Sequence, residues 1–293
     1  MLRIGGFELY SVVTGTFRLD GGAMFGAVPK VLWETVADVD TKNRILLYTR
    51  TLLGVDRSAK RVVLADTGCG TKWSQEQVER FDQRHDRDAI TRQLGSLGLR
   101  DEDVTDVVVT HLHFDHNGGL SEWLGDPGGR AILRYPQARH WIHRRQWEHA
   151  ANPTPKDRAS YLREDIAPLA EGGVLQLVDG DQPAPPFEGL EWFISHGHTP
   201  YHLHPVFEGA THASLGRRLL FVGDLMPTVA HLRPAWVMAY DLHPLTTIRE
   251  KENILRQGLE AGWLLAFAHD PTTAGVAIGG TVDRPVVARA LDL

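Results

Sequence analysis

The sequence predicts an α/β sandwich built from a single domain that spans residues 1–293. Two observations favour this fold class: strand-like segments occur in two groups with helical segments between them, and no stretch has the composition of an interdomain linker. A hydrophobic content of 42% with 23% charged residues is typical of a globular protein with a core, not of a disordered chain.

Apolar periodicity assigns the expected elements in order along the chain. Short alternating strands are expected within residues 1–20, followed by a glycine-rich turn at 21–29 that carries an exposed Met24 and Phe25. Residues 139–149 are aromatic and basic and give no clear pattern. Further strands are expected at 44–51, 61–65, 106–110, 130–134, 191–195, 204–207, 218–222 and 263–268, and helices at 74–96, 156–169 and 244–261.

Composition excludes several classes of protein. With 31 Lys and Arg against 37 Asp and Glu, the net charge of −6 argues against a nucleic-acid partner. One cysteine cannot form an internal disulfide or a thiolate zinc module. We find no secretory signal and no apolar run of the roughly 18 residues that a membrane span needs, so a cytoplasmic protein is expected.

Histidine is abundant, with 15 residues, and it is concentrated after one buried strand. His111, His113, Asp115 and His116 follow the strand expected at 106–110, and imidazole and carboxylate are ligands that suit zinc and similar divalent ions. Side chains two residues apart on an extended chain point to the same side, so His111 and His113 can bind the same metal ion. A packed loop gains nothing from four such side chains unless something binds them, so we predict a metal site. Other histidines, such as His85, His149 and His212, are expected at the surface.

The segment HLHFDH resembles the H-x-H-x-D-H signature of the metallo-β-lactamase superfamily. Four shorter motifs of this family occur in the expected order, which makes the resemblance specific and extends it over most of the chain. These motifs are Asp66-Thr67-Gly68, Gly197-His198-Thr199-Pro200, Gly223-Asp224 and Ala268-His269-Asp270.

The resemblance implies a four-layer αββα sandwich with two divalent metal ions at one sheet edge. Zinc is the first expectation, and manganese, cobalt or iron would accept the same ligands. A metal-bridging hydroxide would then attack a small-molecule lactone, ester or phosphotriester. Asp224 would bridge both ions. By position in the family motifs, the first ion would be held by His111, His113 and His198, and the second by Asp115, His116 and His269.

Further roles follow from the same resemblance. Asp115 would orient the attacking hydroxide, and Asp66 would accept a hydrogen bond from a ligand imidazole. Residues 19–26 resemble a segment of the branch that holds N-acyl-homoserine lactonases and methyl parathion hydrolase, so Met24 and Phe25 would offer apolar surface to the substrate. Many acyl-homoserine lactonases have a tyrosine three residues after the bridging aspartate, where this chain has Pro227. The catalytic donor would then be His231, which we prefer, or Tyr240, a further pocket residue.

Other functions stay open at this point. A thioesterase of the glyoxalase II type would use the same ligands, a persulfide dioxygenase-like oxidoreductase would use one iron, and a degenerate member would only bind metal. His196 is a weaker alternative ligand to His198, and His202 is expected to be structural. The expected partner is a small molecule rather than a nucleic acid or a membrane, and exposed apolar loops suggest a homodimer.

Overall fold

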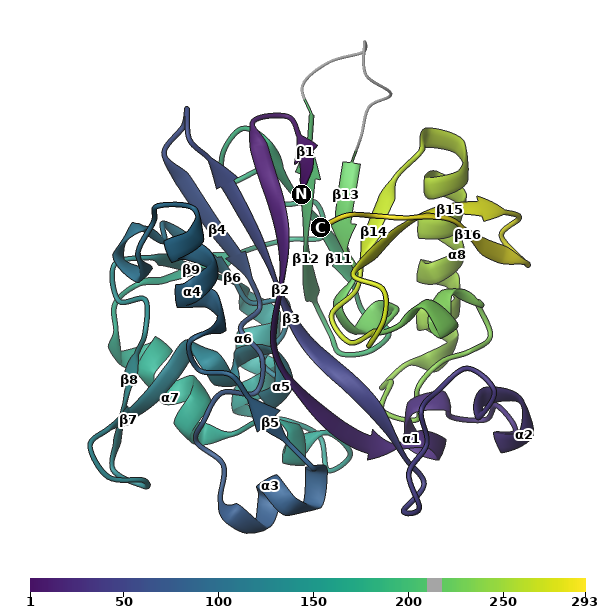
Figure 1. Ribbon diagram of the computed structural model, residues 1–293, viewed down its shortest axis with the longest axis horizontal. Coiled ribbons are helices and arrows are strands. Elements are labelled where there is room, and N and C mark those ends of the chain that lie inside the picture. The colour runs from purple at the N-terminus through teal and green to yellow at the C-terminus, as the bar shows by residue number, and fades with distance from the viewer. Residues whose placement is uncertain (210–217) are drawn as a thin grey trace.

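Two mixed β-sheets lie face to face in the computed structural model, which describes residues 1–209 and 218–293 (Figure 1). The first sheet has the strand order β1-β2-β3-β4-β6-β9-β10 with β5 paired to β2, the second has the order β11-β12-β13-β14-β15-β16, and β7 pairs with β8. The strands are β1 Leu2–Ile4, β2 Phe7–Asp20, β3 Arg44–Asp56, β4 Arg61–Ala65, β5 Arg84–His85, β6 Asp106–Val108, β7 Ser121–Leu124, β8 Arg130–Leu133, β9 Arg139–His143, β10 Leu175–Val178, β11 Leu190–Ser195, β12 His202–Glu208, β13 Arg218–Phe221, β14 Leu264–Ala266, β15 Gly275–Gly280 and β16 Pro285–Ala290.

Helices cover the outer face of each sheet, which completes the four layers (Figure 1). Residues of α4, α6 and α7 pack on the first sheet, and residues of α8 pack on the second. The predicted α/β sandwich of the αββα type is therefore confirmed. The α-helices are α1 Gly21–Phe25, α2 Lys30–Trp33, α3 Gln75–Phe81, α4 Ala89–Ser96, α5 Phe114–Asn117, α6 Arg144–Ala151, α7 Arg163–Glu171 and α8 Pro244–Ala261.

The alternation of side chains along the central strands explains how each sheet buries both faces. In β6 and the residue after it, Val107 and Val109 pack toward the outer helices, whereas Val108 packs between the sheets. In β13, Leu219 and Phe221 face the other sheet and Leu220 faces α8. Because both faces are covered, these strands read as continuous apolar runs in the sequence.

Several local expectations are corrected by the structure. Residues 21–29 begin with the helix α1 rather than a turn, and Met24 and Phe25 are only 2% and 1% exposed. The single helix expected at 74–96 is two helices, α3 and α4, separated by β5, because residues 84 and 85 pair with β2. His85 and His149 are half-buried rather than exposed, and His212 lies outside the described residues.

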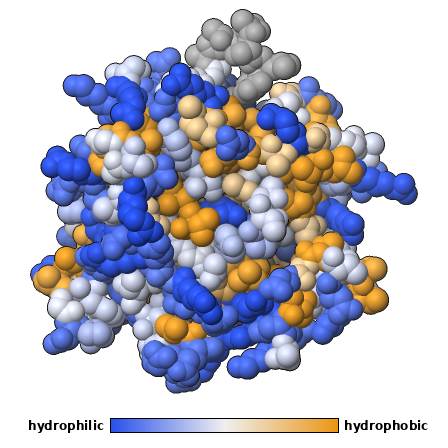
Figure 2. Space-filling model, in the orientation of Figure 1, coloured by the Kyte–Doolittle hydropathy of each residue, from blue (hydrophilic) through white to orange (hydrophobic). Residues whose placement is uncertain are grey.

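Among the described residues, no helix is both long and apolar enough to cross a bilayer. On the face drawn in Figure 2, hydrophobic residues form separate groups between hydrophilic ones.

Candidate metal centre

The site lies where strands from both sheets end. Strands β4 and β6 are parallel neighbours in the first sheet, and β13 and β14 are parallel neighbours in the second. Parallel neighbours end at the same edge of a sheet, so the residues that follow them meet there. These residues are Asp66 after β4, His111 after β6, Asp224 after β13 and His269 after β14.

Two glycines allow the chain to approach itself closely below the site. A Cβ atom on Gly118, just after α5, would lie 2.1 Å from the main-chain oxygen of Cys69. Gly70 has φ +68°, and a Cβ atom there would lie 2.1 Å from the main-chain oxygen of Gly118. This contact seats the one-turn helix that carries Asp115 and His116 directly against the segment that follows β4.

The structure brings all seven residues predicted as metal ligands into two adjoining groups. Within each group, one potential ligand atom per residue lies within 4.8 Å of the others. Asp224 belongs to both: its Oδ2 is 3.3 Å from His198 Nε2, and its Oδ1 is 3.0 Å from His269 Nε2. The first cluster is His111, His113, His198 and Asp224, and the second cluster is Asp115, His116, Asp224 and His269.

Two histidines of the first cluster, His111 and His113, have the neutral rings and free nitrogen atoms that metal ligation needs. His111 Nε2 is buried and has no hydrogen-bond partner among the described residues. Burial lowers the pKa of His111 and of His113 well below its usual value, which keeps these rings neutral as metal ligation requires. Nδ1 of His113 and Nε2 of His198 lie 3.1 Å apart, which is close enough for both to bind one ion. Nitrogen and carboxylate oxygen donors of this kind suit a zinc-like ion in each cluster.

Asp66 holds the imidazole of His116, as the family resemblance implies. Its Oδ2 lies 2.7 Å from His116 Nδ1, which directs the opposite nitrogen of the ring toward the second cluster. The carboxylate also accepts hydrogen bonds from the main-chain N–H and the hydroxyl of Thr110, both at 2.8 Å. Asp66 therefore connects the ends of β4 and β6 to a potential metal ligand.

Two further orienting groups were missed by the sequence analysis. Asp241 Oδ1 lies 3.0 Å from His198 Nδ1, and the main-chain oxygen of Tyr48 lies 2.8 Å from His269 Nδ1. Asp241 stands in a loop just before α8, and Tyr48 contributes only its backbone. No spacing in the sequence marks either group, because both act through contacts between distant segments.

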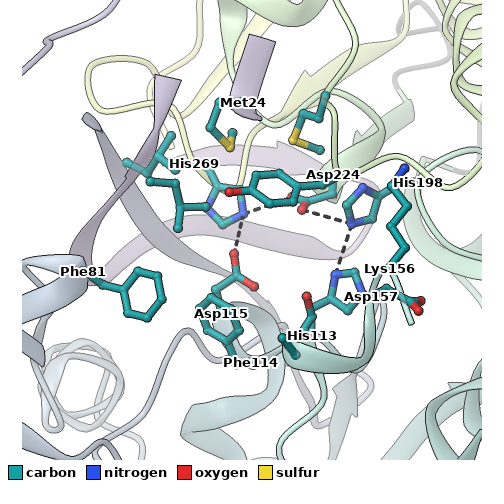
Figure 3. A pocket seen from close by; sticks show the side chains of 16 residues that line it. Met24, Phe81, His113, Phe114, Asp115, Lys156, Asp157, His198, Asp224 and His269 are labelled. Atoms are coloured by element: carbon teal, nitrogen blue, oxygen red, sulfur yellow. Dashed lines mark hydrogen bonds and ion pairs between the residues drawn. The ribbon is translucent and has the colours of Figure 1, made fainter. Parts of the chain in front are cut away.

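Five of the seven cluster residues line a cavity of about 220 Å³: His113, Asp115, His198, Asp224 and His269 (Figure 3). Met24 and Tyr240, both predicted as pocket residues, line it, and Tyr240 is 38% exposed at its mouth. The remaining lining residues are Leu19, Leu47, Phe81, Phe114, Lys156, Asp157, Ala159, Ser160 and Met238.

Two predicted pocket residues do not line this cavity. His231 is 1% exposed, with Nδ1 2.8 Å from the Thr228 hydroxyl and Nε2 2.8 Å from the main-chain oxygen of Met24. Phe25 stacks on its ring at 4.9 Å and on Trp33 at 5.3 Å. Both nitrogens of His231 are thus occupied within the protein, so the expectation that it donates to substrate is corrected. Instead His231 anchors α1, which carries Met24.

His196 and His202, the other histidines of this region, also lie outside the two clusters. His196 Nδ1 accepts a hydrogen bond from the main-chain N–H of Tyr201. His202 is fully buried behind the first cluster, with its ring 4.4 Å from that of His111 and 3.9 Å from that of His204.

Comparison with known proteins agrees with this geometry. The family model described as the metallo-beta-lactamase superfamily matches residues 52–269. The match covers more than half of the chain, so the chain belongs to this superfamily, and the predicted resemblance is confirmed.

Two relatives and two solved structures illustrate the similarity. The N-acyl homoserine lactonase AttM of Azorhizobium caulinodans is 36% identical over 74 residues, which is 25% of this chain and 24% of that protein. The N-acyl homoserine lactonase of Bacillus cereus is 29% identical over 117 residues, which is 40% of this chain and 38% of that protein. The chain therefore matches well under half the length of these relatives.

The structural similarities extend over whole chains. A protein from Staphylococcus aureus described as a probable metal-dependent hydrolase superposes with a TM-score of 0.84 at 27% identity, covering 99% of this chain and 100% of that one. AidC, described as a dizinc quorum-quenching lactonase, superposes with a TM-score of 0.75 at 17% identity, covering 100% and 97%. The second similarity concerns the fold alone.

Proposed function

We propose that this protein is a binuclear metal-dependent hydrolase that acts on a small-molecule lactone or ester, with a phosphotriester as a further electrophile of the same class. The observation that carries the proposal is the position of Asp224, whose two oxygens face two separate His/Asp clusters beside one cavity. The lactonase names of the relatives and of AidC support this substrate class, and the description of AidC as dizinc supports zinc.

Two divalent ions, when bound, would supply a hydroxide nucleophile at neutral pH and polarise the substrate oxygen. The chain's own residues then orient the reactants and move protons. Asp115 lines the cavity beside Asp224, where its carboxylate can accept a hydrogen bond from the nucleophile.

With His231 outside the cavity, Tyr240 is the remaining proton donor proposed from the sequence. Its side chain lines the cavity together with Asp115, Asp224 and His269. Burial raises the pKa of Tyr240 to about 12, so its hydroxyl stays protonated at neutral pH and can donate a hydrogen bond to the leaving oxygen.

A hydrolysis panel on protein of measured metal content tests the proposal. Acyl-homoserine lactones, aliphatic lactones, aryl esters, thioesters and phosphotriesters would be compared by kcat/KM. We expect two metal ions per chain and turnover of at least one lactone or ester, with His113→Ala and Asp224→Ala losing both metal and turnover. His196→Ala, which removes a neighbouring imidazole outside the clusters, serves as the control and should keep both.

Two outcomes would contradict the proposal. Full metal content without turnover of any of these compounds would favour a metal-dependent binding protein. One iron per chain, together with oxygen consumption in the presence of a persulfide, would favour an oxidoreductase.

A further inference from the structure

The cavity has two chemically different sides. Phe81 and Phe114 lie on the side of Asp115, with their rings 6.1 Å apart, whereas Lys156 lies on the opposite side, near His198 (Figure 3). The second cluster is therefore flanked by aromatic surface and the first by a cationic side chain. Other apolar lining residues are Leu19, Met24, Leu47 and Met238.

The ammonium group of Lys156 has no anionic partner in the part of the chain that the structure describes. It donates to the main-chain oxygen of Asp241, which uses one of its three N–H groups. The neighbouring carboxylate of Asp157 is engaged elsewhere, because it lies 2.7 Å from His149 Nε2 and accepts from the Thr154 hydroxyl at 2.6 Å. Lys156 therefore keeps two donors and its positive charge for a ligand in the cavity.

The position of Lys156 is fixed relative to the first cluster. The segment that accepts its hydrogen bond also supplies the Asp241 carboxylate, which lies 3.0 Å from His198 Nδ1. Because one residue contacts both Lys156 and His198, the ammonium group is held on the side of the first cluster, although Lys156 itself is an exposed residue.

With two metal ions bound, the charge of the cavity would also favour an anionic ligand. Two divalent ions and Lys156 would bring five positive charges to the cavity, against three negative charges from the lining carboxylates of Asp115, Asp157 and Asp224. The chain as a whole carries −6, so the cavity would be a local region of positive potential in an acidic protein. Such a region attracts and orients anionic groups.

We propose that Lys156 is a specificity-determining residue that binds a carboxylate on the polar end of the substrate, while the apolar end lies against Phe81 and Phe114. This inference rests on the proposed hydrolase function and narrows its substrate class to amphipathic esters or lactones that carry a negative charge.

A pair of ester substrates tests the role of Lys156. One is 4-carboxyphenyl hexanoate, and the other is 4-carbamoylphenyl hexanoate, its neutral counterpart of nearly the same shape. The ratio of their kcat/KM values, corrected for their rates of hydroxide-catalysed hydrolysis, reports charge recognition. We expect metal-loaded wild type to favour the carboxylate by roughly twofold to fivefold, the range of an exposed ion pair.

The variants separate charge recognition from general effects. Lys156→Met should abolish the preference, mainly by raising KM for the carboxylate ester, and Lys156→Arg should retain part of it. Lys60→Met removes an exposed lysine in the turn between β3 and β4 and should leave the ratio unchanged. Three results would overturn the proposal. Wild type could show no preference for the carboxylate ester, Lys156→Met could lose kcat/KM equally for both esters, or the ratio could be unchanged in that variant.

A non-hydrolysable probe distinguishes failure of this inference from failure of the proposed function. Binding of 4-(hexyloxy)benzoate, which has an ether in place of the ester, would be measured by calorimetry on metal-loaded wild type and Lys156→Met. Binding that depends on Lys156, without hydrolysis of either ester, would support the anion site and contradict the hydrolase. Ester hydrolysis together with probe binding that does not depend on Lys156 would support the hydrolase and contradict the anion site.

Discussion

Three of the candidate ligand imidazoles are oriented by a hydrogen-bond partner at Nδ1. His116, His198 and His269 each direct one nitrogen toward a cluster and hold a partner with the other. Asp66 adopts a left-handed backbone conformation with φ 57°, which is unfavourable for a residue with a side chain. Its hydrogen bonds to Thr110 and His116 offset that cost, so its backbone strain is tied to the geometry of the site.

Asp66 and Asp241, which each orient a candidate ligand histidine, should affect the binding of different metal ions. In Asp66→Asn the charge that orients His116 is lost, so we expect the affinity of the second cluster to fall about tenfold or more. In Asp241→Asn the first cluster should lose affinity instead, because Asp241 contacts His198. Competition with a chromophoric chelator, followed as two sequential sites, measures both affinities.

Asp126→Asn, in an exposed turn, is the control for loss of a negative charge. Unchanged affinity at both sites in the two variants would show that neither aspartate orients a ligand.

At the scale of elements, the N-terminal end of α8 positions the loop that carries His198. The Glu250 carboxylate accepts hydrogen bonds from the main-chain N–H groups of His196 and Gly197 at 2.7 and 3.0 Å. Gly197 packs so closely on α8 that a Cβ atom there would lie 2.4 Å from the main-chain nitrogen of Thr247. The glycine of this motif is therefore required by helix packing, not by the metal.

Gly197→Ala should push the loop and α8 apart. We expect the free energy of unfolding to fall by about 1–3 kcal/mol, the usual cost of overpacking, together with weaker metal binding at the first cluster. Chemical denaturation and metal titration measure the two effects.

Gly95→Ala provides the contrast, since no atom lies within 4 Å of a Cβ atom there and the residue is in helix α4. That change should stabilise the protein by roughly 0.5–1 kcal/mol. An equal change in the free energy of unfolding in Gly197→Ala and Gly95→Ala would contradict the close packing of Gly197.

At the scale of the whole molecule, each cluster joins the two sheets. The first cluster combines His111 and His113, which follow β6 of the first sheet, with His198 and Asp224 from loops of the second. The second cluster likewise combines Asp115 and His116 with Asp224 and His269. A bound ion would therefore resist separation of the layers.

Removal of metal should accordingly lower the melting temperature of the protein. A ligand present at 100 times its dissociation constant stabilises the folded state by about 2.7 kcal/mol per site, which corresponds to a shift of roughly 5 °C or more for a chain of this size. Thermal unfolding before and after chelation, and after zinc or manganese is restored, measures the shift. An unchanged melting temperature in protein shown to be metal-free would contradict this role.

The sequence alone located the elements whose pattern is local. The β-strand at residues 61–65 and the helix at 244–261 have the predicted bounds, because a continuous apolar run and a period-3.6 apolar pattern leave a direct trace in the sequence. In contrast, β5 interrupts a helical pattern because it pairs with β2, and the edge strand β16, whose residues are mostly exposed, gave no prediction. Elements defined by a distant partner were not readable from their own residues.

The same division holds for the site. Ligand chemistry in the sequence indicated His111, His113, Asp115 and His116. The family resemblance added His198, Asp224 and His269, and all seven ligand roles stay a prediction. Only the tertiary structure separated Met24 and Tyr240, which line the cavity, from Phe25 and His231, which do not. It alone brought Asp241 to His198 and Lys156 to the cavity rim, because packing between segments far apart in the chain decides those contacts.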